Sequence, residues 1–144
     1  MKRKFKHSGQ QGFTLLEIMV VIVIMGLLVA VVAPNVLQNQ DKAMVEKVRT
    51  DVMLMEQALD MYKMDNFVYP TTDQGLDSLV AKPESDPIPK RYNADGYIKR
   101  LPKDPWGNPY QYLQPGQHSK VDIYSLGADG ELGGKGIAAD IGNW

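Results

Sequence analysis

Two aspartates near the end of the chain, Asp129 and Asp140, lie in a stretch that could bind a metal ion. Hard cations such as Ca²⁺ take about six to eight oxygens from carboxylates and carbonyls, and glycine lets carbonyls turn inward at positive φ. The spacing is not that of an EF-hand, because the repeated acids and the closing glutamate are missing. Composition alone leaves ordinary turn aspartates as the alternative. The stretch has six glycines: Gly127, Gly130, Gly133, Gly134, Gly136 and Gly142.

A second residue with possible chemistry is Glu17, an acid inside an apolar run. Among the 21 residues from Phe13 to Ala33, only Thr14 and Glu17 are polar. An unpaired acid near the centre of a membrane costs about 2.5–3.5 kcal/mol or more, and the run contains no Lys, Arg or His. Glu17 therefore pairs with a group from elsewhere, or lies near enough to the membrane surface to stay hydrated.

The remaining polar side chains do not indicate an enzyme. His7 and His118 have no Cys, His or acid neighbour at ligand spacing, and Ser119 and Ser125 have no convincing triad around them. There is no glycine-rich phosphate loop and no cysteine. Without the first twelve residues, the chain has 12 basic and 17 acidic residues, a net charge of −5. This balance argues against nucleic-acid binding.

The apolar run has the length of a membrane span, since a helix needs about 20 residues to cross a ~30 Å hydrocarbon core. The basic residues before it predict a cytoplasmic N-terminus and an exported remainder. A cleaved secretory signal is the alternative, but its apolar region is shorter, and Pro34 makes Val31-Val32-Ala33 a poor cleavage site. The basic residues are Lys2, Arg3, Lys4 and Lys6.

The helical pattern continues beyond the apolar run. Apolar residues recur at helical spacing and predict one buried stripe on an amphipathic helix: Met44, Val48, Val52, Met55, Leu59 and Tyr62. Charged residues off this stripe are expected to face solvent: Asp41, Lys47, Asp51 and Lys63. The helix should run from Phe13 to about Met64, with a kink at Pro34. The segment between Gly26 and Pro34 should be its weakest part.

The chain after the helix predicts a small mixed domain. Six prolines make long regular structure unlikely between residues 82 and 109, after a short helix near Leu76 to Val80. Tyr110 to Gln114 and Val121 to Leu126 read as two strands, with Pro115-Gly116 as the turn. A hairpin this small needs the helix to pack on. The expected parts are a helix to about residue 64, a loop at 65–109, a sheet at 110–126 and the glycine-rich loop at 126–144.

The sequence Gly12-Phe13-Thr14-Leu15-Leu16-Glu17 resembles the leader of type IV pilins and pseudopilins. The resemblance implies that residues 1–12 are a basic leader, removed by a prepilin peptidase that cuts between Gly12 and Phe13. It also implies methylation of the new amine on Phe13. Residues 13–33 would then serve as membrane anchor and later as filament core, in which Glu17 sets the register. Partial melting of the helix between Gly26 and Pro34 is expected on assembly.

Further motifs resemble one branch of that family, the major pseudopilins of type II secretion. They are Tyr69-Pro70-Thr71-Thr72, Gln74-Gly75-Leu76, Leu101-Pro102-Lys103-Asp104-Pro105-Trp106-Gly107 and Asp140-Ile141-Gly142-Asn143-Trp144. The branch binds one Ca²⁺ in its C-terminal loop. Carried over, the ligands are the side chains of Asp129 and Asp140 and the carbonyl of Leu126, with Ser125 and carbonyls near Ile137 as weaker candidates. Some members carry two adjacent acids where this chain has Ala139-Asp140.

The resemblance implies an α+β, type IV pilin-like fold, in which a long helix packs on a small antiparallel sheet and Ca²⁺ staples the C-terminal loop. It implies a non-enzymatic subunit of a periplasmic filament that drives folded proteins across the outer membrane of a Gram-negative bacterium. Residues 34–144 would be periplasmic, and the N-terminus would remain on the cytoplasmic side of the inner membrane. Implied partners are other copies of the chain, minor pseudopilins, the prepilin peptidase, an inner-membrane assembly platform and membrane lipid.

Two alternatives remain open at this point. A surface type IV pilin for adhesion or motility would share the N-terminal motif. A singly anchored periplasmic calcium-binding protein would keep the bond between Gly12 and Phe13 uncut.

Overall fold

A computed structural model describes residues 12–144, apart from the side chains of residues 33–37. The four basic residues near the N-terminus and His7 lie outside the described part, as does the side chain of Pro34. The chain divides into two units, one ending at Asn39 and the other spanning Gln40–Trp144. Each unit is described by itself.

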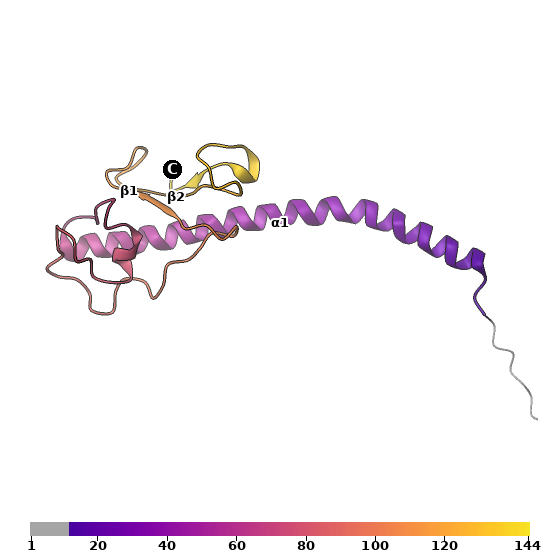
Figure 1. Cartoon of the computed structure of the whole chain (residues 1–144), viewed down its shortest axis with the longest axis horizontal. Helices are drawn as coiled ribbons and strands as arrows, with labels where there is room; N and C mark the ends of the chain where they lie inside the picture. The colour runs from indigo at the N-terminus through magenta and orange to yellow at the C-terminus, as the bar shows by residue number, and fades with distance from the viewer. Residues whose placement is uncertain (1–11) are drawn as a thin grey trace, which may run out of the picture. The chain divides into compact units, whose positions relative to one another are not determined.

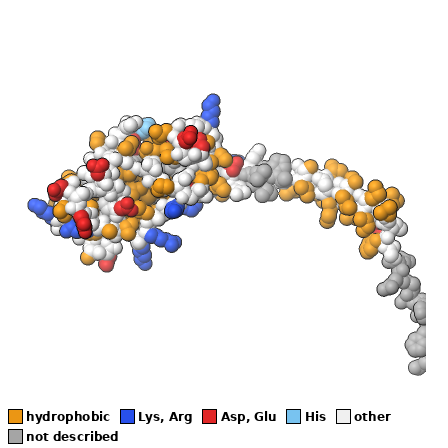
Figure 2. Space-filling model, in the orientation of Figure 1, with side chains coloured by type: hydrophobic (Ala, Val, Ile, Leu, Met, Phe, Trp, Pro, Cys, Tyr) orange, Lys and Arg blue, Asp and Glu red, His pale blue; other side chains and the backbone are white. Residues whose placement is uncertain are grey.

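The first unit consists of the N-terminal part of α1 (Leu15–Asn66). α1 begins two residues later than expected because Thr14 caps it: Thr14 Oγ1 accepts a hydrogen bond from the Glu17 amide at 3.2 Å. Leu15–Val32 is long and apolar enough to cross a membrane, with a mean hydropathy of 3.1. Its side chains are exposed within the chain, and hydrophobic side chains cover the visible face of this segment (Figure 2).

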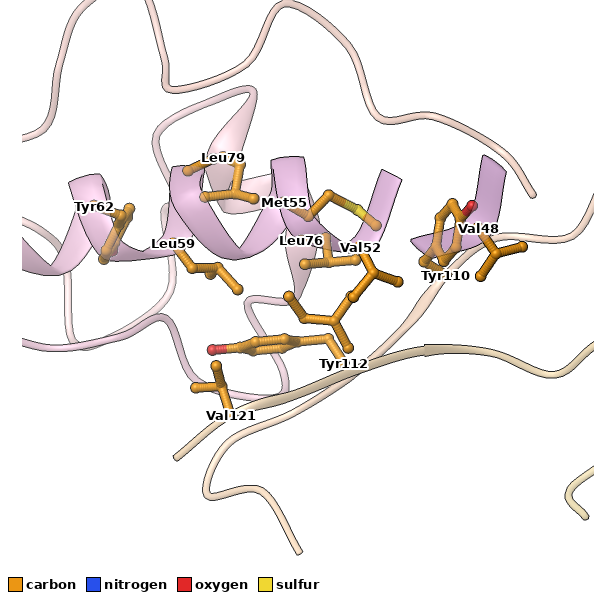
Figure 3. Packing of buried hydrophobic residues seen from close by; sticks show 12 residues of the cluster. Val48, Val52, Met55, Leu59, Tyr62, Leu76, Leu79, Tyr110, Tyr112 and Val121 are labelled. Atoms are coloured by element: carbon orange, nitrogen blue, oxygen red, sulfur yellow. The ribbon is translucent and has the colours of Figure 1, made fainter. Parts of the chain in front are cut away.

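In the second unit, the predicted stripe of α1 forms one side of the core. Five of its six residues are buried, and Met44 is half-buried. They pack against η1 (Leu76–Leu79), the expected short helix, and against residues of the sheet. Figure 3 shows these side chains converging between the helix and the strands. The core contains Val48, Val52, Met55, Ala58, Leu59, Tyr62, Leu76, Leu79, Tyr110, Tyr112, Val121 and Ile123.

One residue of the expected solvated face is instead buried. Asp51 is only 9% exposed. Its Oδ2 accepts a hydrogen bond from the hydroxyl of Tyr110 at 2.8 Å and forms an ion pair with Lys47. The prediction for Asp51 was wrong because helical periodicity places a residue on a face but does not show what packs over that face. Here Tyr110 covers the carboxylate and supplies a partner for it.

The sheet has three antiparallel strands in the order β1 (Gln111–Leu113), β2 (Asp122–Ser125) and β3 (Ile141–Gly142). β1 and β2 are the two expected strands and lie alongside α1 in Figure 1. Tyr112 faces Ile123 across the first pair, and Tyr124 faces Gly142 across the second. β3 was not predicted, because it has only two residues and no alternating pattern.

The connection between β1 and β2 spans residues 114–121, one residue longer at each end than the expected strand bounds leave, and the expected turn residues Pro115-Gly116 lie within it. The carboxylate of Asp122 organises this connection by accepting hydrogen bonds from its backbone. Beyond β2, the glycine-rich loop contains the short 3₁₀ helix η2 (Gly136–Ala138) and returns to the sheet through β3.

Candidate functional site

The first candidate site is the start of α1. Gly12 and Phe13 precede the helix and are exposed, Phe13 by 78%. Thr14 and Glu17 stand three residues apart, which is the spacing of a capping box, and the Glu17 amide bonds to Thr14 Oγ1. The sequence pattern indicated Glu17 as an acid in an apolar run, but it did not indicate Thr14 as the cap of the helix.

This geometry leaves the Glu17 side chain available for pairing. The residue is exposed at the first turn of α1, where the positive end of the helix dipole favours an acid. An amine released at Phe13 would stand four residues before Glu17, within reach of its own subunit or a neighbour. The first turn therefore presents an exposed acid four residues after Phe13, with apolar side chains around it.

The second candidate site is the glycine-rich loop, which folds back on itself through backbone hydrogen bonds. The Ala128 amide donates to the Ile137 carbonyl at 2.9 Å, and the Asp140 amide donates to the Gly133 carbonyl at 3.1 Å. Gly134 allows a close approach, because a Cβ there would lie 2.1 Å from the Ala138 carbonyl oxygen. The loop is thus folded by its backbone rather than by apolar side chains.

The two predicted acidic ligands have different surroundings. Asp129 is exposed, and its Oδ1 accepts a hydrogen bond from the Glu131 amide at 3.1 Å. Asp140 is half-buried, and its Oδ2 accepts from the Gly133 amide at 3.0 Å. The other oxygen, Asp140 Oδ1, is buried without a hydrogen-bond partner among the described residues.

The orphaned Asp140 oxygen fits a cation, since a buried carboxylate oxygen without a partner is costly. No cluster of three Asp, Glu or His side chains that could hold a metal occurs within residues 12–144. A cation in this loop would therefore take the rest of its ligands from backbone carbonyls or water, which suits Ca²⁺. Leu126, whose carbonyl is the third predicted ligand, directly follows β2 at the start of the glycine-rich loop.

The weaker candidate Ser125 has a structural partner. Its hydroxyl donates to Asp104 Oδ2 at 2.7 Å and accepts from the Gly127 amide at 3.1 Å. Asp104 is 4% exposed, and its Oδ1 accepts from the amides of Trp106 and Asn108. This network fastens the N-terminal end of the glycine-rich loop to the 104–108 turn, and the sequence analysis did not identify it.

Asp122 is a buried carboxylate that was not selected from the sequence. The statement that His118 has no acid neighbour at ligand spacing was wrong, because Asp122 lies four residues later and its Oδ2 contacts His118 Nδ1 at 3.2 Å. Asp122 is 1% exposed, and its oxygens accept from three amides, those of Gln117, His118 and Ser119. Burial by itself would raise the pKa of Asp122, but these amide donors, with that of His118 first, outweigh burial and lower the pKa below its ordinary value. The carboxylate therefore stays charged and holds the 114–121 connection closed.

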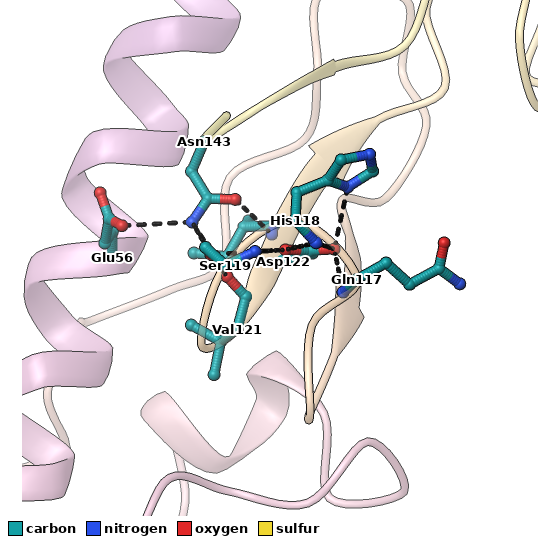
Figure 4. Close-up of polar contacts among 8 residues, drawn as sticks. Glu56, Gln117, His118, Ser119, Val121, Asp122 and Asn143 are labelled. Atoms are coloured by element: carbon teal, nitrogen blue, oxygen red, sulfur yellow. Dashed lines mark hydrogen bonds and ion pairs between the residues drawn. The ribbon is translucent and has the colours of Figure 1, made fainter.

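The end of the chain forms a further network that the sequence analysis did not anticipate. Asn143 bonds to β2, to Ser119 and to Glu56 of α1, as Figure 4 shows. The ring of Trp144 stacks on His118, with centroids 4.0 Å apart. The only hint in the sequence was the closing motif, because these contacts join segments far apart in the chain.

The predicted helix-melting segment lies in the first unit. α1 has no break between Leu15 and Asn66, so Gly26 and Pro34 both lie within its bounds. A Cβ at Gly26 would meet nothing within 4 Å, so no packing within the chain requires a glycine there. Melting on assembly remains a prediction.

Comparison with known proteins finds a matching family or motif for each part of the chain. Residues 35–144 match the family described as type II secretion system (T2SS), protein G, and residues 7–33 match the prokaryotic N-terminal methylation motif. The chain is 62% identical to type II secretion system core protein G of Vibrio cholerae over 139 residues, which cover 96% of this chain and 94% of the relative. It is 58% identical to the protein of the same name from Pseudomonas aeruginosa, with 96% and 98% covered.

The fold has a counterpart among solved structures. The crystal structure of the major pseudopilin from the type 2 secretion system of enterohaemorrhagic Escherichia coli superposes with a TM-score of 0.69. The two chains are 53% identical, and the match covers 74% of this chain and 87% of that one. The two sequence matches, the helix-and-sheet fold and the identity over nearly the full length of the relatives all indicate the same family. The chain belongs to the type II secretion system protein G family.

Proposed function

We propose that this chain polymerises through its N-terminal helix into the pseudopilus of a type II secretion system. The observation that carries the proposal is the apolar surface of Leu15–Val32, which lies exposed on a helix that bears the methylation motif. The match to the protein G family favours a secretion subunit over the two alternatives, a surface pilin and a singly anchored sensor.

The apolar helix serves in succession as anchor and as filament core. Before assembly, lipid covers its side chains, so the protein is held in the membrane by a single span. We place the N-terminus in the cytoplasm and residues 34–144 in the periplasm of a Gram-negative bacterium. In the filament, copies of the same helix replace lipid as the apolar cover. The chain performs no catalysis, and the work comes from a cytoplasmic ATPase that acts through an inner-membrane assembly platform.

Processing at Gly12 creates the group that Glu17 needs. A prepilin peptidase cuts between Gly12 and Phe13 and leaves a methylated, positively charged amine on Phe13. In an apolar filament core, this amine and the Glu17 carboxylate pair, because either charge alone would be costly to bury. Pairing with a neighbouring copy would also fix the axial register of the subunits.

The cation site completes the second unit, Gln40–Trp144, which we call the globular unit. Asp129 and Asp140, with the Leu126 carbonyl, would hold Ca²⁺, and carbonyls near Ile137 could contribute further oxygens. The bound cation supplies positive charge for the orphaned Asp140 oxygen and ties the two halves of the loop together. The loop has no disulfide to order it, so metal binding offsets part of its conformational entropy.

Assembly also changes the helix. We expect the segment between Gly26 and Pro34 to lose helical structure in the filament, where neighbouring helices cover its backbone. Glycine and proline make this the segment that costs least to extend. A filament map with unbroken helix from Phe13 to Met64 would contradict this expectation.

The proposed function is tested by complementation. A strain that lacks the gene should retain its exoenzymes in the periplasm, and the wild-type chain should restore their secretion. Intact-mass measurement of the membrane-extracted protein should give a chain that starts at a methylated Phe13, and bulky substitution of Gly12 should block this processing. Normal secretion in the deletion strain would contradict the role in secretion. A mature chain that starts at Met1 would contradict the processing step.

A further inference from the structure

The last four residues, Ile141–Trp144, fasten the end of the glycine-rich loop to the rest of the globular unit, and we call them the C-terminal clasp. We propose that Asn143 is a positioning residue for the cation: it holds the clasp against β2 and α1 and thereby places the Asp140 carboxylate before the cation binds. This inference rests on the calcium site proposed above. It assigns to Asn143 a role that does not require contact with the metal.

β3 alone is too short to hold the clasp in place. It has two residues, with Ile141 facing Ser125 and Gly142 facing Tyr124. Strands of this length are marginal unless other contacts support them. Asp140 directly precedes β3, so any fraying of the strand would carry the carboxylate away from the loop.

Asn143 supplies the missing contacts through both its backbone and its side chain. With Ile123 of β2 it forms a reciprocal pair: the Asn143 amide donates to the Ile123 carbonyl at 3.2 Å, and Asn143 Oδ1 accepts from the Ile123 amide at 3.1 Å. Nδ2 lies within hydrogen-bond distance of three acceptors, the carbonyl of Val121 (3.0 Å), Oε1 of Glu56 (3.2 Å) and Oγ of Ser119 (3.3 Å), and its two hydrogens can serve two of them at once.

Figure 4 shows that Asn143 lies between β2 and the helix, with its amide directed at both. The position requires an acceptor and donors on one short side chain, which is what asparagine offers. An aspartate would keep the acceptor oxygen but lose the donors, and its charge would face the Val121 carbonyl and the Glu56 carboxylate. Asn143→Asp therefore tests the hydrogen bonds of this side chain while its shape stays the same.

Ring contacts close the clasp on its outer side. The ring of Trp144 stacks on His118 with 13° between the planes and packs on Tyr124 with centroids 5.6 Å apart. Gly142 makes this possible, because a Cβ there would lie 2.3 Å from Cζ3 of the Trp144 ring. The Asp122 carboxylate holds His118 in turn, through a contact of 3.2 Å to Nδ1. The clasp thus rests on the ordered 114–121 connection.

The clasp explains why the two acidic ligands differ. Asp140 is bonded to Gly133 through its amide and through Oδ2, while its buried Oδ1 is left free for a ligand. Asp129 is exposed, and its Oδ1 accepts from the amide of Glu131, only two residues along the chain, so this bond does not tie it to another part of the loop. A ligand held in position before binding loses less conformational entropy. Mutation of a residue that orients a metal ligand without contacting the metal typically lowers metal affinity by roughly ten- to a hundredfold.

The test compares the full chain in detergent micelles as wild type, Asn143→Asp and Asn143→Ser. Calcium affinity is measured by titration calorimetry, and hydrogen exchange is followed in the calcium-free protein. Both variants should weaken calcium binding roughly tenfold or more. Without calcium, they should speed exchange at the amides of Gly133 and Asp140, whose bonds depend on the position of Asp140.

Two control variants separate positioning from general stability. Glu56→Gln keeps an acceptor for Asn143 and should bind calcium as the wild type does. Leu79→Val, a change in the core away from the loop, should lower the melting temperature without changing calcium affinity. If the Asn143 variants lose stability but keep wild-type affinity and exchange, the clasp is only structural and the inference is overturned. If the wild type itself binds no calcium, the metal site is wrong and this inference fails with it. If the wild type binds calcium and the Asn143 variants bind it equally well, only this inference fails.

Discussion

Two stretches of α1 are both rich in apolar residues, but only one finds its cover within the chain. Between residues 48 and 62, apolar side chains form a stripe that the sheet and η1 bury, so that Leu59 is 0% exposed. Between residues 15 and 32, apolar side chains surround the helix, and Leu27 is 64% exposed. A stripe can be buried by one small domain, whereas a helix that is apolar on all sides needs lipid or other helices. The stretch at residues 48–62 stabilises the subunit, and the stretch at residues 15–32 is available for assembly.

The strongest test of this comparison removes the charge from the assembly stretch. Glu17→Val should leave membrane insertion intact, because loss of a charge favours the membrane. It should reduce exoenzyme secretion to the level of the deletion strain, because the Phe13 amine loses its partner. Secretion and filament yield are measured beside Ile18→Val, an apolar control on the same turn. Normal filaments from Glu17→Val would contradict the pairing.

A matched pair of leucine truncations tests which stretch stabilises the globular unit. Leu59→Ala should lower its free energy of unfolding by about 2–5 kcal/mol, the usual cost of a cavity in a core. Leu27→Ala should have no measurable effect on this quantity, because Leu27 lies outside the core cluster. Both are measured by thermal unfolding of the detergent-solubilised chain, followed by tyrosine fluorescence. Equal effects of the two changes would break the comparison.

Calcium should stabilise the globular unit only. At a hundredfold excess over Kd, a ligand specific for the folded state adds about 2.7 kcal/mol, so calcium should raise the melting temperature and chelator should lower it. Mg²⁺ should substitute poorly, because it demands octahedral geometry. Asp129→Ala and Asp140→Ala should each abolish the response, while Glu131→Gln, an exposed neighbour, should keep it. An identical melting temperature with calcium and with chelator would rule out the site.

The smallest expected effect concerns the buried carboxylate of Asp122 and its dependence on pH. Its folded-state pKa is lowered, so its stabilisation is fully present above the unfolded pKa of about 3.9 and is lost as pH falls through the lower folded value. Asp122→Asn should therefore cost about 1–3 kcal/mol at pH 7, and less as the pH falls below about 4. Asp95→Asn, at an exposed position, serves as control. A cost that does not change with pH would show that charge is not what Asp122 contributes.

Periodic features of the sequence predicted most of the fold. The buried stripe of α1, the apolar span and the strands β1 and β2 all follow from repeated spacing or from length, and the structure confirms them. The prediction for Asp51 was wrong, and β3 was missed. Each depends on contacts between distant segments, such as the bond from Tyr110 to Asp51, which no local pattern encodes.

The candidate site divides in the same way. Asp140 was selected as a ligand because the family resemblance implies it, since an acid among glycines alone does not separate a ligand from a turn residue, and its orphaned oxygen supports that selection. Asn143 and Asp104 could not be selected, since an amide or an acid in a loop has many ordinary roles. Their importance lies in what they contact: Ile123 and Glu56 in one case, Ser125 in the other.

Our central claim is that the apolar N-terminal part of α1, Leu15–Val32, is covered by copies of itself in the assembled state. An electron-microscopy map of filaments formed by the mature chain tests this most directly. The account predicts that residues 15–26 of neighbouring copies pack against one another along the filament axis, with Glu17 beside a Phe13 amine. A map in which the globular units alone hold the filament together, with these residues away from the axis and from each other, would contradict the account.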